Sequence, residues 1–179
     1  MALKTQGFSG AIAANYIPAL NAVQATDGTK ILLLAHTVAE GFNPKTVAFK
    51  SNNPGNIGTD TTQNRIRNYP TLVDGVAAQI NQKNLIMAGN SKYYKPTDSL
   101  LKYLTTYAPP PQNNPQNYLK IVVGVFAKQG YTVNANTTLL QISNLGNEKK
   151  KTSPQRTYNF FRNFILRNSF IASTYLKKK

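Results

Sequence analysis

The sequence contains no cysteine and a single histidine among its 179 residues. The lack of cysteine excludes disulfides and thiolate metal sites, and one histidine excludes a multi-histidine zinc site. We therefore expect neither a metal nor an organic cofactor, and any catalysis has to use other groups. Acidic residues are also scarce, and the candidates for acid–base chemistry are Asp27, Glu40, Asp60, Asp74, Asp98 and Glu148.

Long hydrophobic runs are absent as well. The longest, residues 31–35 and 121–127, are well short of the ~18 to 20 residues that span a bilayer. The first eight residues contain no long apolar core and no small-residue cleavage site. The sequence therefore predicts neither a transmembrane helix nor a secretory signal peptide.

Positive charge is in large excess, because 21 Lys and Arg face six Asp and Glu and give a net charge of +15. Such a balance indicates an anionic partner, which the charge alone leaves open among nucleic acid, a membrane surface and a cell-wall polymer. Residues 147–179 hold nine Lys or Arg against Glu148, so they contribute +8 of the +15. We therefore expect two units, a domain at 1–146 and a basic tail at 147–179. In the tail, an amphipathic helix is predicted from the spacing of Phe161, Phe164, Ile165, Asn168 and Ile171, with Arg162 and Arg167 off that stripe.

Apolar residues recur at helical spacing along most of residues 1–146, which predicts a mostly α domain. Helices are expected at 27–40, 73–80, 100–104, 114–130 and 137–144, with Asp27 and Asn114 as N-caps and Gly41 as a stop signal. Residues 43–70 are rich in Asn, Pro, Gly and Thr, which predicts a long loop with room for a short hairpin. A loop of that length usually serves a function.

Glu40 is the acidic residue with the most unusual position. It ends a predicted helix immediately before Gly41, where the negative pole of the helix dipole disfavours a carboxylate. Apolar neighbours such as Val38 and Phe42 would add desolvation, so the sequence predicts a carboxyl group that resists ionisation. A glutamic acid that keeps its proton is what the general acid of glycosidic bond cleavage requires. The alternative is a solvated glutamate at a frayed helix end.

The segments around Glu40 carry a recognisable pattern. The run AHTVAEGF at 35–42 is followed by SNNPGNIG at 51–58, then by YPT at 69–71, DGVA at 74–77 and YAPP at 107–110, with Asn113, Asn114 and Tyr118 beyond. In this order they resemble the lysozyme-like superfamily, specifically the lytic transglycosylase and lysozyme domains of bacteriophages. The resemblance covers residues 16–145. It implies a fold of the α+β lysozyme-like type, here a single helical domain with a long cleft loop and a basic C-terminal helical extension.

The resemblance implies cleavage of the β-1,4 bond between N-acetylmuramic acid and N-acetylglucosamine in peptidoglycan, with Glu40 as the catalytic acid. A transglycosylase needs only this carboxylate, because Glu40 then acts as base on the muramic acid 6-hydroxyl and a 1,6-anhydro product forms. A hydrolytic lysozyme uses a second carboxylate, about 5 to 5.5 Å away when it retains configuration and about 6.5 to 9.5 Å when it inverts. Asp60 and Asp74 are the candidates for that second group, although Asp74 also fits a helix cap. The scarcity of acids favours the single-carboxylate route.

Other residues are expected to shape the substrate cleft. The amides of Asn52, Asn53 and Asn56 suit sugar hydroxyl and acetamido groups, unless they only satisfy the backbone of their own turn. Tyr107 and Tyr118 are expected either to line sugar subsites or to form half-buried core. His36, the lone histidine, lies one turn before Glu40, and we expect it to be structural.

The absence of a predicted signal peptide fits two settings, assembly into a phage virion and release at lysis. The basic tail favours the virion, where residues 149–179 would contact capsid proteins or the inner membrane surface, or else form a disordered solubilising extension. Two other functions stay open. One is a catalytically inactive lysozyme-like structural protein of the virion, and the other is a basic nucleic-acid-binding protein, although no signature of a nucleic-acid-binding module accompanies the charge.

Overall fold

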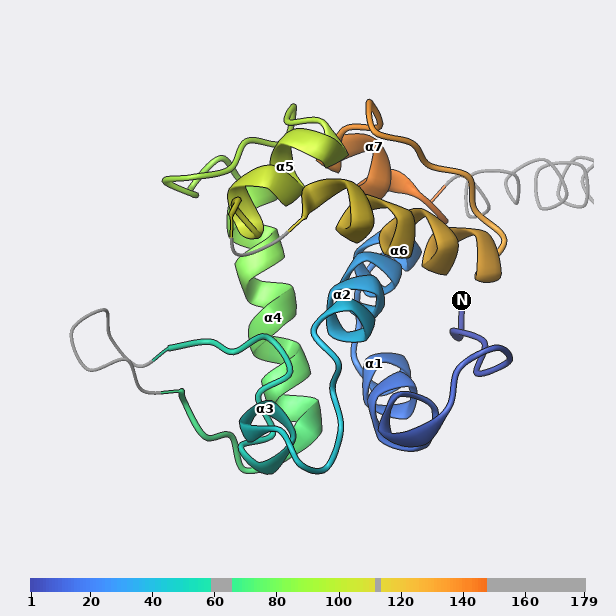
Figure 1. Cartoon of the computed structure of the whole chain (residues 1–179), viewed down its shortest axis with the longest axis vertical. Coiled ribbons are helices and arrows are strands. Elements are labelled where there is room, and N and C mark those ends of the chain that lie inside the picture. The colour runs from blue at the N-terminus through green and yellow to red at the C-terminus, as the bar shows by residue number, and fades with distance from the viewer. Residues whose placement is uncertain (59–65, 112–113, 148–179) are drawn as a thin grey trace, which may run out of the picture. The chain divides into compact units, whose positions relative to one another are not determined.

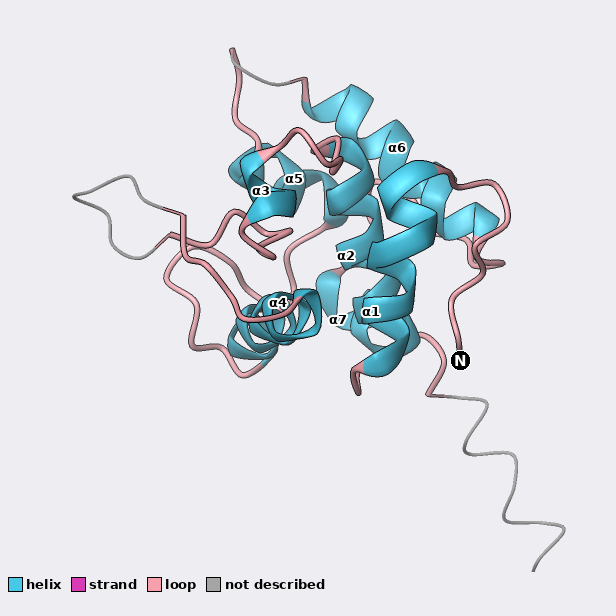
Figure 2. Cartoon of the chain, turned by 90° about the horizontal axis from the view of Figure 1, so that it is seen from below, coloured by secondary structure: helices cyan, strands magenta, loops and turns pink. Residues whose placement is uncertain are grey.

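The structure is a computed structural model that describes residues 1–58, 66–111 and 114–147. The chain divides into two units, Met1–Leu145 and Gly146–Lys179. The predicted amphipathic helix of the tail lies outside the described residues. The described part of the first unit is mainly helical (Figures 1 and 2), as the sequence predicted. Its elements are η1 (Ile12–Tyr16, a π-helical turn), α1 (Ile17–Ala22), α2 (Asp27–Ala39), α3 (Val47–Lys50), α4 (Leu72–Met87), α5 (Leu100–Tyr107), α6 (Pro115–Lys128) and α7 (Leu139–Asn144).

No strand forms within the described ranges, where β pairing is limited to two isolated antiparallel bridges, Gly58 with Ile66 and Ser99 with Thr138. Five of the helices, α2 and α4 to α7, fall where hydrophobic periodicity predicted them. The pair η1 and α1 was not predicted, and neither was α3, which is a single turn inside the predicted loop. Residues 59–65, which would form the tip of the expected hairpin, are outside the described residues.

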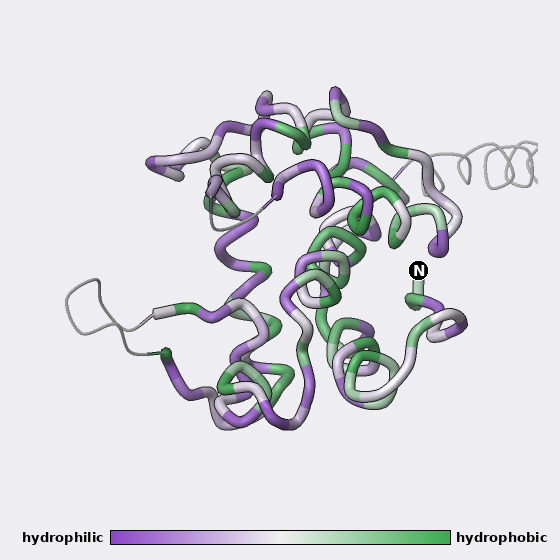
Figure 3. The backbone as a smooth tube through the Cα atoms, viewed as in Figure 1, coloured by the Kyte–Doolittle hydropathy of each residue, from purple (hydrophilic) through white to green (hydrophobic). Residues whose placement is uncertain are grey.

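Helix α2 is the central element of the unit. It packs against α1, α4, α6 and α7, and the tube in Figure 3 is largely hydrophobic along it. Every residue from Asp27 to Thr37 is buried. A helix that is buried on all sides requires neighbours on all sides. The end of α2 is where the chain comes back to the surface, because Glu40, its C-cap, is exposed.

The predicted cap of α2 is wrong by one residue. Thr26 is the N-cap, and its side-chain oxygen accepts a hydrogen bond from the Thr29 N–H at 3.2 Å. Asp27 is instead the first helical residue, and its carboxylate accepts from the Tyr131 hydroxyl at 2.8 Å. Threonine caps a helix much as aspartate does, and an acidic side chain is also favourable in the first turn. Asn114 caps α6 as predicted.

Residues 52–54 of the loop lie in close contact with the first turn of α4. A Cβ on Gly75 of α4 would lie 1.8 Å from the carbonyl oxygen of Asn52. Only a glycine permits this approach. Asn52 and Asn56 both adopt left-handed backbone angles, with φ of 51° and 49°. These contacts turn the loop tightly beside the first turn of α4.

Candidate active site

Glu40 ends α2 in a turn that separates it from its apolar neighbour. Gly41 adopts a φ of +69°, and the Phe42 N–H then donates to the Thr37 carbonyl at 3.2 Å. This reversal buries Phe42, which is 5% exposed, while Glu40 stays exposed. The expected desolvation of Glu40 by its apolar neighbours is therefore wrong. The left-handed turn sends the apolar side chain inward and leaves the carboxylate accessible to a ligand.

Tyr118 contacts the Glu40 carboxylate from a distant part of the sequence. Its hydroxyl, carried by the first turn of α6, donates to Glu40 Oε1 at 3.2 Å and lies 3.5 Å from the His36 carbonyl oxygen. Burial raises the pKa of Tyr118 far above its usual value of 10.0, and the nearby Tyr107 and Glu40 raise it further. The hydroxyl therefore stays protonated and acts as a hydrogen-bond donor to the carboxylate.

Aromatic residues surround Tyr118 on its inner side. The ring of His36 lies 4.3 Å from that of Tyr107, 5.4 Å from Tyr103 and 5.6 Å from Tyr118, measured between centroids. Tyr107 also meets Tyr118 edge to face at 5.9 Å. We call these four residues the aromatic cage. It joins α2, α5 and α6 directly beneath the Glu40 carboxylate.

His36 is structural, as predicted. It is 3% exposed, and within the described residues its Nε2 atom has no hydrogen-bond partner. Burial, together with the positive charge of Lys83, lowers the pKa of His36 well below 6.5. The imidazole is therefore neutral near neutral pH and serves as an aromatic ring in the cage.

The asparagines of the loop have backbone partners. Asn53 is fully buried, and its amide nitrogen donates to the carbonyls of Ile57 at 2.9 Å and Arg67 at 2.7 Å while its oxygen accepts from the Ile57 N–H. These bonds use both amide hydrogens, so the predicted contact of Asn53 with substrate is wrong. Its role is to fix the shape of the turn. Asn52 likewise donates to the Tyr69 carbonyl at 3.0 Å, whereas Asn56 is exposed.

The other described acids have structural partners. Asp74 accepts from the N–H and hydroxyl of Thr71 in a capping box at the start of α4, so its alternative assignment as a helix cap is confirmed. Asp98 pairs with Lys102 at 2.7 Å, and Asp27 is bonded to Tyr131. Asp60, the other candidate for a second carboxylate, lies outside the described residues. Glu40 is exposed, and it differs from these described acids because its partner is the Tyr118 hydroxyl of the aromatic cage.

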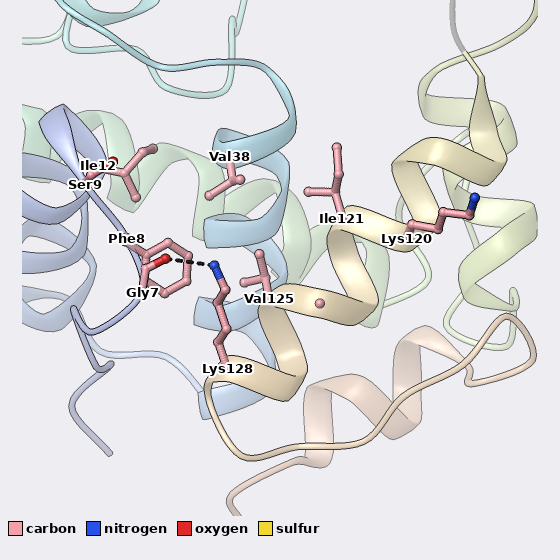
Figure 4. A pocket seen from close by; sticks show the side chains of 10 residues that line it. Gly7, Phe8, Ser9, Ile12, Val38, Lys120, Ile121, Val125 and Lys128 are labelled. Atoms are coloured by element: carbon pink, nitrogen blue, oxygen red, sulfur yellow. Dashed lines mark hydrogen bonds between the residues drawn. The ribbon is translucent and has the colours of Figure 1, made fainter.

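A separate apolar groove of about 390 Å³ lies between the N-terminal segment, the last turn of α2 and α6 (Figure 4). Phe8, Val38 and Val125 line it, and Lys128 spans one end with its ammonium group on the Gly7 carbonyl at 2.7 Å. None of the residues predicted to act in catalysis or substrate binding lines this groove. Its walls come from three segments far apart in the chain, so no sequence pattern indicated it.

The described residues contain no group of three or more His, Asp or Glu side chains arranged to hold a metal ion. No helix among them combines the length and the apolar character needed to cross a membrane. No protein-family model, curated protein or solved structure matches the chain. A functional assignment therefore depends on the sequence motifs and on the geometry around Glu40.

Proposed function

We propose that the protein is a peptidoglycan-cleaving enzyme, a lytic transglycosylase or a muramidase, that cuts the β-1,4 bond between N-acetylmuramic acid and N-acetylglucosamine. The observation that carries the proposal is the hydrogen bond from Tyr118 to an exposed Glu40, with Tyr107 packed against Tyr118. The sequence motifs singled out these three residues separately, and Glu40 and Tyr118 are 78 positions apart in the chain. Their meeting supports a common function.

In the proposed reaction bound substrate excludes water from Glu40, which lies at the negative pole of α2, so that it enters as a carboxylic acid and donates its proton to the oxygen of the leaving sugar. The bond from that oxygen to the anomeric carbon breaks, and a carboxylate is left on Glu40. The Tyr118 hydroxyl, kept protonated by its environment, stabilises the new charge by its hydrogen bond. Such a donor acts most strongly on the charged form, so it lowers the energy of the transition state more than that of the bound substrate.

The second half of the reaction distinguishes the two enzyme types. In a transglycosylase the Glu40 carboxylate takes the proton of the muramic acid 6-hydroxyl, whose oxygen attacks the anomeric carbon and closes a 1,6-anhydro ring. In a muramidase water attacks instead, with the help of a second carboxylate. The structural roles of Asp27, Asp74 and Asp98 favour the transglycosylase. Asp60 is the residue to test for the muramidase.

We further propose that the helical unit is of the lysozyme-like type and that the enzyme is carried in a bacteriophage virion. The net charge of +15 suits an anionic wall polymer. The basic residues 149–179 would contact capsid proteins or the inner membrane surface.

The experiment is mass spectrometry of the soluble fragments that the protein releases from purified peptidoglycan. We expect anhydro-muropeptides, lighter than the hydrolysis products by one water, from the wild-type protein and none from Glu40→Gln. Asp74→Asn is the matched control, because it makes the same change at an exposed acid that only caps a helix. It should cleave at the wild-type rate while losing about 0.3 to 1 kcal/mol of stability, because the negative charge in the first turn of α4 is removed.

Products with reducing ends, lost in Asp60→Asn, would replace the transglycosylase by a muramidase. Equal release by wild type and Glu40→Gln would exclude Glu40 as the acid. If the wild type released nothing from the walls of its host, the proposal would be wrong, and the structural and nucleic-acid-binding alternatives would take its place.

A further inference from the structure

Lys83 of α4 contacts the aromatic cage at Tyr103 and Tyr107, at the end of the cage away from Glu40. Its side chain is half-buried, and its ammonium group donates a hydrogen bond to the hydroxyl of Tyr103. The same nitrogen lies 4.9 Å from the centre of the Tyr103 ring and 5.9 Å from that of the Tyr107 ring. Because this nitrogen is bonded to the Tyr103 hydroxyl, it lies beyond the hydroxyl at the edge of that ring, and the ring left to attract it as a cation is that of Tyr107.

Contacts run without interruption from Lys83 to the candidate active site. Tyr103, which accepts the hydrogen bond of Lys83, lies 6.1 Å from Tyr107 between ring centres. Tyr107 lies 5.9 Å from Tyr118, whose hydroxyl reaches Glu40 at 3.2 Å. Tyr107 is therefore the α5 ring that packs against Tyr118, and Tyr103 acts on it from the side of Lys83.

Lys83 is also the group of this cluster that changes charge closest to neutral pH. Desolvation lowers its pKa to about 8. The histidine and the tyrosines around it stay uncharged there. The pKa of His36 is well below 6.5, and burial raises the pKa values of the tyrosines around it above 10.0. These tyrosines are Tyr94, Tyr103, Tyr107 and Tyr118, and Glu40 lies at the far end of the cluster.

We propose that Lys83 is a positioning residue, whose ammonium group holds Tyr103 and Tyr107 in the arrangement that presents the Tyr118 hydroxyl to Glu40. Loss of the proton removes the attraction of the cation to the Tyr107 ring and weakens the hydrogen bond to the Tyr103 hydroxyl. The cage then loses its preferred arrangement, and the hydrogen bond to Glu40 is populated less. The catalytic part of this inference rests on the proposed function, whereas its structural part can be tested without any substrate.

The structural test uses the absence of tryptophan. Without it the near-ultraviolet circular dichroism comes mainly from the ten tyrosines. We expect the signal of the wild type to change with a midpoint near pH 8, below the range of about 10 in which exposed tyrosines ionise. Lys83→Arg should show no such transition, because a guanidinium keeps its charge beyond about pH 12. Lys83→Met should show the high-pH spectrum of the wild type at every pH.

The catalytic test follows fragment release against pH. The wild-type rate should fall above about pH 8, the pKa value of Lys83. In Lys83→Arg the fall should move to higher pH, and Lys83→Met should have a lowered kcat, little change in KM and no such fall. The matched control is Lys92→Met, which removes a lysine 5.6 Å from the ring of the exposed Tyr93. It should leave the spectrum and the pH profile unchanged.

The outcomes separate the two proposals. A transition near pH 8 that persists in Lys83→Arg, or the lack of any transition in the wild type, overturns the role of Lys83. A wild-type transition that Lys83→Arg abolishes supports that role even if no wall fragments are released, in which case the proposed function fails alone. If Lys83→Met does not fold, the comparison of the wild type with Lys83→Arg still decides.

Discussion

At the scale of single residues, the candidate site depends on how polar side chains divide between structure and surface. The side chains of Asn53 and Asp74 have structural roles. Asn53 donates hydrogen bonds to the backbone of its turn, and Asp74 accepts one at the start of α4. Glu40 is held by one hydroxyl and is otherwise exposed. Asp74 is also exposed, so what distinguishes Glu40 is its partner, which is the hydroxyl of Tyr118 and not the start of a helix.

Replacing Tyr118 by Phe removes the hydroxyl and keeps the ring. We expect Tyr118→Phe to lower kcat about tenfold to a hundredfold, the range for losing a hydrogen bond to a charged group, with little effect on KM. The cage keeps its packing, so the unfolding midpoint should change little. Fragment release and thermal unfolding measure the two effects.

Tyr131→Phe is the control for this change. It also removes a tyrosine hydroxyl bonded to a carboxylate, that of Asp27 at 2.8 Å, at the opposite end of α2. Its kcat should equal that of the wild type. Equal loss of kcat in both variants would show that Tyr118 acts through stability alone.

The site could be predicted from the sequence only where a local pattern marks a residue. Glu40 followed by Gly41 is such a pattern, and Tyr118 was predicted to line the site because it belongs to the series of motifs that resembles a known family. Lys83 has no such signal, because its meaning comes from Tyr103 on another helix. Asn53 was misassigned because a buried and an exposed asparagine look alike in a turn sequence.

At the scale of elements, two glycines allow close backbone contacts, one between a helix and the loop and one between two helices. Gly75 brings α4 against the loop at Asn52, and a Cβ on Gly28 of α2 would lie 1.7 Å from the carbonyl oxygen of Ile142 in α7. Neither position can take a side chain without moving a backbone. The turn that contains Asn53 is therefore held both by its own hydrogen bonds and by α4.

Gly75→Ala tests the contact between α4 and the loop. In an open helix position, alanine for glycine adds about 0.5 to 1 kcal/mol of stability. Here the Cβ would meet the Asn52 carbonyl at 1.8 Å, so we expect a loss of about 1 to 3 kcal/mol in urea unfolding. Gly124→Ala in α6, where a Cβ meets nothing within 4 Å, should stabilise the protein. Equal effects of the two changes would contradict the contact.

The elements that the sequence predicted are those with a long periodic stripe and a clear end. Helices α2 and α6 combine both, with Gly41 and Gly130 at their ends. Helix α3 has a single turn and no buried residue, so it leaves no periodic signal. The segment Ile12–Ala22 escaped prediction because it joins a π-helical turn to α1, with Pro18 near the start of α1.

At the scale of the whole molecule, the charge is the dominant property. Residues 1–146 and 147–179 are both basic, so attraction to an anionic polymer does not depend on one unit alone. Long-range attraction of this kind is screened by salt, whereas the hydrogen bond between Tyr118 and Glu40 is short and local. Adsorption to the wall and cleavage of the bond should therefore respond differently to ionic strength.

We expect replacement of Lys177, Lys178 and Lys179 by Gln, which lowers the net charge from +15 to +12, to weaken adsorption to purified walls several-fold at about 50 mM NaCl. The difference should shrink at about 500 mM NaCl, where the screening length is shorter. The cleavage rate on small soluble wall fragments should stay the same. Sedimentation of walls with bound protein measures adsorption, and weakened binding that is independent of salt would argue against an electrostatic role.

The left-handed turn at Gly41 also limits how this chain can change in length. Because Gly41 ends α2 directly after Glu40, one inserted residue within the helix would rotate the carboxylate by about 100° and shift it by about 1.5 Å. It would then lose Tyr118, which is attached to a different helix. Homologous chains that keep this site should therefore differ by substitution within residues 27–41, and their insertions and deletions should lie elsewhere.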